Sequence, residues 1–209
     1  SLGFDEALAA QCDADWVVIP RRDRLDPIAW ARQETRKPPI DAHYLSYPFE
    51  RPDDPKGGLH GAEWKARAAA RTSILLDEEM SSQGSCWFMP RRFFVDTIGP
   101  LDHQRFTSFW DEFQEIGNKA WLSGGKVMVN KAVTYLHLHK GNTYGRGYPI
   151  SKPATVDALR YSAEFWMTDQ WTQAVRPLRW LVEHFWPVPT WPADLDAAFR
   201  LAYEAYNRQ

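Results

Sequence analysis

The spacing of hydrophobic and polar residues predicts alternating helices and strands in the first part of the chain. Residues 4–11 have the composition of a short helix. The apolar run 16–19 that follows ends at Pro20, which predicts a short buried strand. A helix leading directly into a strand favours an α/β fold.

The stretch from Arg21 to Gly61 is dominated by proline and polar residues, which interrupt any long helix or strand. Long connections inside a compact domain are usually functional or disordered. The aromatic residues within 44–49 favour order. We therefore expect a long ordered loop here.

Further elements follow at regular intervals. We expect helices where helical spacing recurs and strands where apolar residues run together or alternate with polar ones. The predicted helices are 63–71, 91–98, 113–122 and a final amphipathic helix at 194–206, and the predicted strands are 84–89 and 126–138. Residues 156–186 read as an aromatic-rich helical tail, broken afterwards by the prolines of 187–189.

Composition describes a globular chain with no general affinity for nucleic acid. The 209 residues are 44% hydrophobic and 25% charged, enough to bury one substantial core. The formal charge of −2 provides no overall basic field for phosphates, so nucleic acid is not indicated as a partner. The 11 tryptophans are more than a core normally requires. Most of them will pack, but indole faces also stack on sugar rings and bases.

The two cysteines, Cys12 and Cys86, lie far apart and lack the spacing of a zinc site or a disulfide framework. No apolar run is long enough to cross a bilayer, and the first residues lack the features of a secretory signal. We expect a cytoplasmic protein. The sequence begins without methionine, in a stretch with the composition of a helix. We therefore expect either a tag remnant at the start or a missing upstream segment.

Acidic residues gather where the helix around 113–122 begins. Asp111, Glu112 and Glu115 are near its start, and the last two are one turn apart on one face. The positive end of the helix dipole favours ionised carboxylates there, which would keep a general base available at neutral pH. An ordinary acidic first turn is the simpler interpretation of the pattern alone.

Two histidines, His137 and His139, follow the strand predicted at 126–138. Side chains alternate along a strand, so both imidazoles lie on one face and suit a divalent ion. A lone His-x-His is more often a structural or surface pair. The glycine-rich loop that comes next contains Lys140, Tyr144 and Arg146, whose charges and ring can hold a diphosphate. A plain surface turn is the alternative for this loop.

Together these pieces resemble the catalytic half of GT-A-type, family 2-like glycosyltransferases. The resemblance rests on segments 84–91, 98–102, 110–116 and 119–125, which read GSCWFMPR, IGPLD, WDEFQEI and KAWLSGG. In that family an E/D-x-x-E helix start supplies the general base, and an R/K-x-W-x-x-G-G turn leads into a strand that ends at a metal-ligating histidine. Many members have Asp after the first Glu, where this chain has Phe113, so Asp111, Glu112 and Glu115 all stay candidates for the base.

The resemblance implies a metal-dependent, inverting transfer of a sugar from a nucleotide-sugar donor to a glycan or other hydroxyl acceptor. The metal, Mn²⁺ or Mg²⁺, would neutralise the leaving nucleoside diphosphate, with His139 as the first candidate ligand and His137 as the second. Imidazole suits Mn²⁺ better than Mg²⁺. Residues expected to face the acceptor are His60, Gly61, Trp64, Gly84, Ser85 and Trp87.

The resemblance covers about residues 4–190 and matches only the part of the family that follows its D-x-D metal motif. Asp13-Ala14-Asp15 has that spelling, but the apolar strand comes after these carboxylates instead of before them. We therefore expect the D-x-D on a preceding segment or on a second chain. The predicted fold is α/β, a partial GT-A fold over 1–150 with an aromatic-rich helical extension over 151–209.

Two other functions fit parts of the pattern. A catalytically silent carbohydrate- or nucleotide-binding remnant would explain the tryptophans without the D-x-D. A metal-dependent hydrolase built on His137, His139 and the carboxylates ranks below it, because no third-ligand motif such as H-E-x-x-H is present.

Overall fold

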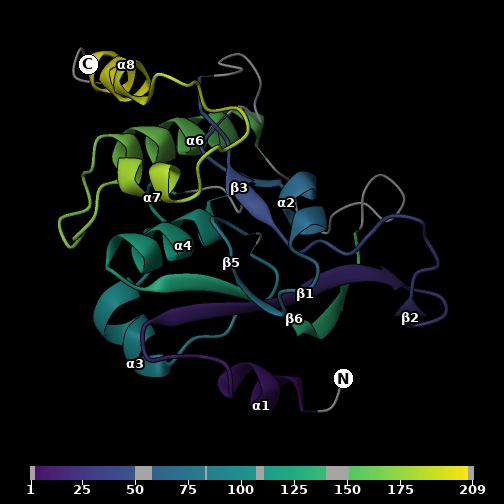
Figure 1. The fold of residues 1–209 in the computed structure, drawn as a ribbon. Coiled ribbons are helices and arrows are strands. Elements are labelled where there is room, and N and C mark those ends of the chain that lie inside the picture. Colours follow the sequence, from purple (N-terminus) through teal and green to yellow (C-terminus); the bar gives the residue numbers. More distant parts are fainter. Residues whose placement is uncertain (1–2, 50–57, 83, 107–110, 140–150, 207–209) are drawn as a thin grey trace.

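A mixed four-stranded sheet forms the centre of the protein (Figure 1). The computed structural model describes residues 3–49, 58–82, 84–106, 111–139 and 151–206. The strand order is β2-β1-β6-β5. The central strands β1 (Trp16–Asp26) and β6 (Lys126–His137) are parallel, while β2 (Ala31–Arg32) and β5 (Leu76–Glu78) pair antiparallel at the two edges.

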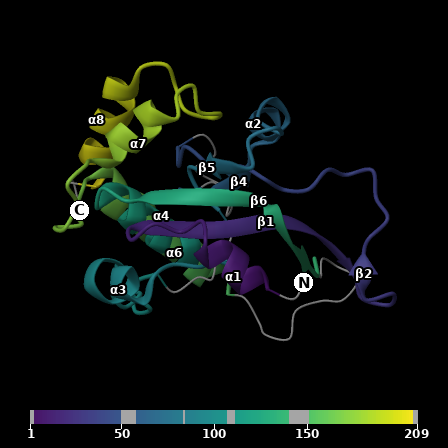
Figure 2. The ribbon, with the colours of Figure 1, turned by 60° about the horizontal axis from the view of Figure 1, so that its bottom comes forward.

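Alternation along β1 divides its apolar side chains between two layers. Val17 and Ile19 face the main core, while Val18 belongs to a smaller cluster with Leu8 and Met128. The first helix, α1 (Phe4–Ala9), covers the smaller cluster from below the sheet, as Figures 1 and 2 show. Each such fully buried aliphatic side chain contributes roughly 1.5–3 kcal/mol, which fixes the two central strands in place.

The opposite face of the sheet carries α4 (Glu112–Leu122) and, beyond it, the C-terminal helices (Figure 1). These are α6 (Lys152–Met167), α7 (Leu178–His184) and α8 (Leu195–Tyr206). The predicted aromatic-rich helical tail is therefore confirmed, although a non-helical stretch separates α6 from α7. Its side chains join one continuous core with those of β1, β6 and α4. The division at residue 150 remains a prediction.

The prediction of a long loop between residues 21 and 61 is wrong in two places. β1 does not stop at Pro20 but continues to Asp26, with a register shift between Pro20 and Arg21 that lets the strand pass the proline. Farther along, β3 (His43–Leu45) pairs with β4 (Gly61–Glu63) as a separate two-stranded sheet. Short strands among prolines leave no periodic signal in the sequence, so only the tertiary pairing reveals them.

The prediction of a strand at 84–89 is also wrong. Among the described residues of this segment, the only β-bridge is the one between Phe88 and Val18. The helices on either side are confirmed. α2 (Lys65–Ala70) lies within the predicted 63–71, and α3 (Arg91–Phe93) continues into the π-helical turn η1 (Phe94–Ile98) before Gly99.

None of the helices in the described part of the chain is long and apolar enough to cross a membrane. Cys12 and Cys86 are both free thiols, as their separation in the sequence predicts.

Candidate functional site

Glu112, the first residue of α4, lies against the predicted acceptor segment. A Cβ atom built on Gly84 would lie 2.6 Å from Oε2 of Glu112, so only glycine fits there without moving the carboxylate. The indole of Trp87 hydrogen-bonds to the same carboxylate and lowers its pKa, but burial raises the pKa more, and the net shift is upward. The fold therefore brings Glu112 to Gly84 and Trp87, two predicted site residues from a distant part of the sequence.

Asp111, the residue before α4, is completely buried. Neither of its carboxylate oxygens has a hydrogen-bond partner among the described residues. Burial raises its pKa to about 7, and the nearby Ser162 hydroxyl offsets only part of that shift. Burial therefore acts against the helix dipole at both Asp111 and Glu112 and raises the pKa of both carboxyls.

Glu115 is held by contacts within the fold. Both of its oxygens accept the backbone N–H of Asp102 at 3.1 Å, and Oε1 lies 2.7 Å from the ammonium of Lys119. Its side chain is 2% exposed. The carboxylate thus ties the turn after η1 to α4, and its contacts leave no oxygen directed at a ligand.

The segment after Gly84 is joined to β6 through hydroxyl groups. The exposed Ser85 shares a short hydrogen bond with the Tyr135 hydroxyl. Tyr135 also interacts with Arg22 on the neighbouring strand, where the two residues are in register. Ser85 is therefore connected through Tyr135 to the polar residues of the central strands.

A buried polar chain, which the sequence did not indicate, extends from Arg22. The Arg22 guanidinium donates to Nε2 of His43 at 3.3 Å, and because arginine only donates, the ring proton belongs on Nδ1. Nδ1–H then donates to Glu79 at 2.6 Å. Burial lowers the pKa of His43 to about 3 and raises that of Glu79 well above its usual range. His43 is therefore neutral.

The two histidines lie side by side at the end of β6. Their ring centroids are 4.7 Å apart, and the rings are nearly perpendicular. Nδ1 of His137 is buried and has no hydrogen-bond partner within the described ranges. Burial, followed by the charge of Arg22, lowers the pKa of both histidines, that of His139 to about 4. Both rings are thus neutral at physiological pH, the form that ligates metals.

This pair fits part of a divalent-metal site. Two neutral imidazoles, one of which has an orphaned Nδ1, are suitable donors for Mn²⁺. However, no group of three or more His, Cys, Asp and Glu residues suited to a metal occurs in the part of the chain that the structure describes. The described residues therefore supply two ligands, and the remaining ligands would come from elsewhere.

The other predicted acceptor residues surround the β3–β4 pair. His60 donates from Nδ1 to the Gly58 carbonyl at 2.7 Å and lies 3.0 Å from the Ser46 hydroxyl. A Cβ on Gly61 would lie 2.6 Å from the carbonyl oxygen of Ser82, so close packing requires glycine there.

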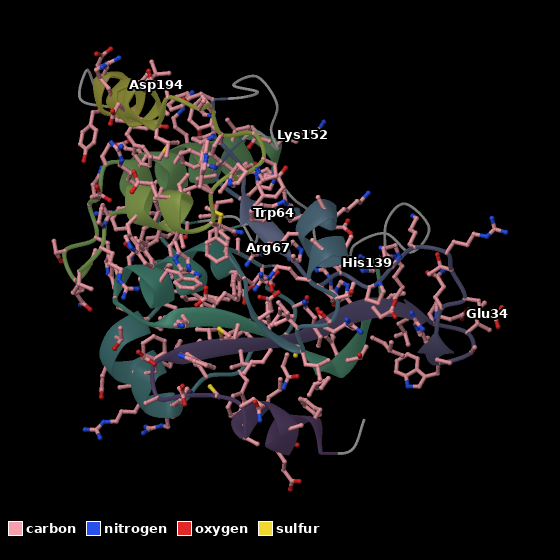
Figure 3. All side chains as sticks on the ribbon, viewed as in Figure 1. Glu34, Trp64, Arg67, His139, Lys152 and Asp194 are labelled. Atoms are coloured by element: carbon pink, nitrogen blue, oxygen red, sulfur yellow. The ribbon has the colours of Figure 1, made fainter. Side chains whose placement is uncertain are left out.

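Trp64 is only 9% exposed. It packs edge-on against Tyr44 with ring centroids 5.7 Å apart, and the Arg67 guanidinium lies 5.4 Å from its ring (Figure 3). The structure gives Trp64 a packing role. Lys140, Tyr144 and Arg146, the predicted donor-binding residues, lie outside the described residues.

Comparison with known proteins supports the fold. No family model matches the sequence, and no curated protein matches it. Among solved structures, the chain is similar to GalNAc-T7, a glycosyltransferase of GT-A fold crystallised with UDP, GalNAc and Mn²⁺, at 15% identity and a TM-score of 0.52. The match covers 92% of this chain and 34% of that one. The chain thus spans about a third of that structure's length, and the likeness confirms a GT-A-like α/β fold.

Proposed function

We propose that this chain forms the acceptor side of a glycosyltransferase that moves a sugar from a nucleotide-sugar donor onto a hydroxyl group. The observation that carries the proposal is the placement of Glu112, half-buried at the start of α4 and in contact range of Gly84 and Trp87. The GT-A-like fold supports it, because that fold is shared with a nucleotide-sugar transferase.

Glu112 is the proposed general base. An attacking hydroxyl must lose its proton as it bonds to the anomeric carbon, and a carboxylate within hydrogen-bond reach accepts that proton. Direct attack by the acceptor would invert the anomeric configuration. The pKa of Glu112, raised by burial, makes it a stronger base than an exposed glutamate once it is ionised. Asp111 is fully buried and Glu115 is bonded to Asp102 and Lys119, which favours Glu112 among the three acids.

The acceptor is proposed to enter beside Gly84 and Ser85, both of which are exposed. Gly84 leaves the Glu112 carboxylate unobstructed, and the Ser85 hydroxyl can exchange its bond to Tyr135 for one to the acceptor. The half-buried Trp87 holds Glu112 in position through its indole N–H. A glycan hydroxyl satisfies these contacts, as does a hydroxyl on another molecule.

His137 and His139 are the proposed protein ligands of a divalent ion, with Mn²⁺ preferred to Mg²⁺. Nδ1 of His137 is buried and has no hydrogen-bond partner among the described residues, which makes this residue the stronger candidate of the two. When bound, the ion supplies Lewis-acid stabilisation of the leaving diphosphate. Lys140, Tyr144 and Arg146 remain proposed donor contacts on the basis of their residue types.

A transfer assay tests the function. The protein is incubated with Mn²⁺, a set of nucleotide sugars and a set of hydroxyl acceptors, and glycosylated products are detected by mass spectrometry. We expect one donor–acceptor pair to give product and Glu112→Gln to abolish it, while the exposed-site control Glu34→Gln keeps activity. Nucleotide binding without transfer to any acceptor would favour the binding remnant. Sugar release without an acceptor would favour a hydrolase.

A further inference from the structure

The turn between β1 and β2 presents two large apolar side chains to solvent. The pairing of these strands ends at Asp26 and Ala31, so residues 27–30 form a four-residue turn, which we name the hairpin tip. Ile28 is 91% exposed and Trp30 is 77% exposed, the two highest values among the large hydrophobic side chains of the described residues. Figures 1 and 2 show β2 at the outer end of the sheet, away from the C-terminal helices. The hairpin tip therefore protrudes from the body of the protein.

The hairpin tip has a fixed conformation that holds a strained residue in solvent. The carboxylate of Asp26 accepts the backbone N–H groups of Ile28 at 2.8 Å and of Ala29 at 3.0 Å. Trp30 has a φ of 50°, in the left-handed region that bulky residues rarely adopt. Packing of the indole does not offset this strain, because most of the ring is exposed. An unfavourable backbone conformation without a packing benefit indicates a functional role for the side chain.

The area of the hairpin tip favours a lipid surface over a protein partner. A stable protein interface covers about 800 Å² on each partner. An indole offers about 250 Å² at most, and the side chain of isoleucine is smaller, so Ile28 and Trp30 fall well short of that area. A lipid bilayer needs no matching surface, because it takes up individual apolar side chains between its headgroups. Tryptophan in particular is enriched at that depth of the bilayer.

Two exposed basic residues, Arg36 and Lys37, follow the hairpin tip in the chain. Neither forms an ion pair with a carboxylate of the described residues. Backbone contacts keep this segment beside β1, because the Gln33 N–H donates to the Arg24 carbonyl at 2.8 Å and the Arg24 guanidinium donates to the Pro38 carbonyl at 3.0 Å. The two positive charges therefore stay close to the hairpin.

The exposed charges of this end of the protein are mostly positive. Within residues 28–38, the bases Arg32, Arg36 and Lys37 are exposed, whereas Glu34 is the one acid. Arg32 already pairs with Asp23, which leaves Arg36 and Lys37 to interact with an anion. Figure 3 shows Glu34 at this outer end of the protein. Lysine and arginine beside an inserted apolar tip are attracted to a membrane surface that contains anionic lipid.

We propose that the hairpin tip inserts Ile28 and Trp30 into the headgroup region of an anionic phospholipid bilayer, where Arg36 and Lys37 bind the lipid phosphates. Arginine and lysine bind phosphate oxygens through charge-assisted hydrogen bonds. The protein then lies on the membrane surface and is held there by one turn. This inference goes beyond the proposed function and does not depend on it.

Sedimentation of the full chain with sucrose-loaded vesicles tests the inference. Vesicles of phosphatidylcholine alone are compared with vesicles in which about one-third of the lipid is phosphatidylserine. We expect binding to the anionic vesicles that weakens as sodium chloride rises from about 50 to about 300 mM, because salt screens exposed charges. Ile28→Ser/Trp30→Ser should lower the partition coefficient on these vesicles at least about tenfold. Arg36→Gln/Lys37→Gln should lower it by about tenfold as well, and only on the anionic vesicles.

Two further variants separate membrane binding from folding. Leu75→Ser/Val175→Ser removes two other exposed apolar side chains and is the matched control, which should leave the partition coefficient unchanged. Trp30→Asn removes the indole but places at this position a residue that tolerates a positive φ. We expect Trp30→Asn to weaken vesicle binding and to raise the melting temperature by roughly 2–4 °C, because the backbone strain is relieved. A loss of binding in this variant is therefore not a folding defect.

Two results would overturn the inference. One is the absence of binding to the anionic vesicles, or binding that Ile28→Ser/Trp30→Ser leaves unchanged. The other is a dimer in sedimentation velocity that the same double variant dissociates, together with no vesicle binding, which would assign the hairpin tip to a second copy of the chain. Neither result bears on sugar transfer by Glu112, which the product assay measures separately.

Discussion

Glu112 and Gly84, which are far apart in the sequence, approach so closely that a Cβ on Gly84 would lie 3.0 Å from the carboxyl carbon of Glu112. The contact joins the start of α4 to the segment preceding α3. Gly84 is also exposed. A substitution there should therefore act on the position of Glu112 more than on the core.

Gly84→Ala tests this contact. The added methyl group displaces the Glu112 carboxylate, and a general base moved by about 1 Å loses up to about 100-fold in rate. We expect kcat to fall by about 10- to 100-fold while the melting temperature changes by less than about 3 °C, because the site is exposed. Steady-state kinetics and circular dichroism measure the two quantities. An unchanged kcat would contradict the assigned geometry.

Glu112 and Glu115 should respond to substitution in opposite ways. Glu112→Gln removes the base and should lower kcat by about 10²- to 10⁴-fold with little loss of stability. Glu115→Ala leaves the Lys119 ammonium buried without its carboxylate and should lower the free energy of unfolding by roughly 3 kcal/mol. Urea unfolding measures the second effect, with the exposed Glu34→Ala as control. Similar stabilities for the Glu115 and Glu34 variants would contradict the structural role.

Asp111 should make the stability of the protein depend on pH. Its pKa is about 7 when folded and about 3.9 when unfolded, so the folded state holds a proton that the unfolded state has lost between these values. The stability is fully present below about pH 4 and declines as pH rises to about 7, by a total on the order of 4 kcal/mol.

Asp111→Asn removes this proton exchange. We expect the variant to match the wild type near pH 4 and to melt at a higher temperature near pH 8, as measured by differential scanning calorimetry across that range. The exposed Asp96→Asn is the control and should follow the wild-type curve. A wild-type melting temperature that rises between pH 4 and 7 would refute the prediction. A pH dependence that Asp111→Asn leaves unaltered would refute it as well.

Two buried tryptophans provide a matched pair for measuring how the C-terminal part is attached. The Trp191 indole N–H donates to the Leu45 carbonyl at 2.7 Å, whereas the Trp166 N–H has no hydrogen-bond partner among the residues described. Trp→Phe removes a similar volume at either position. Trp191→Phe should therefore cost about 1–2 kcal/mol more than Trp166→Phe, because it leaves a buried carbonyl unpaired.

Chemical denaturation of the two tryptophan variants and the wild type gives that difference directly. Equal costs would indicate that the bond to Leu45 contributes nothing net. The comparison also reports on the division at residue 150, since Trp191 lies in the proposed extension and Leu45 in the proposed catalytic part.

Local pattern in the sequence was enough for elements that carry their own boundary signals. The helix that begins at Glu112 ends at Leu122, directly before the Ser123-Gly124 turn, and β6 extends from Lys126 to His137. Period and punctuation are properties of neighbouring residues, so they can be read without tertiary structure. The acidic helix start and the histidine pair were found for the same reason.

Burial decided what the sequence alone left undetermined. In the sequence, the three acids near the start of α4 look alike, because the helix dipole favours ionisation of any carboxyl there. They are Asp111, Glu112 and Glu115. Only the fold buries Asp111 and places Gly84 against Glu112. It also brings the Asp102 backbone N–H to the carboxylate of Glu115, which pairs with Lys119 on the same helix. Desolvation then raises the pKa of Asp111 and of Glu112, which is the opposite of the effect of the helix dipole.

The same reason explains the residues that sequence reasoning missed. Arg22, His43 and Glu79 lie on three separate segments, and no spacing among them suggests contact. The sequence by itself determined most of the helices, the first part of β1, the strand β6 and the residue types of the candidate site. The tertiary structure alone decided which side chains meet and which are buried, because those contacts join segments that are far apart in the sequence.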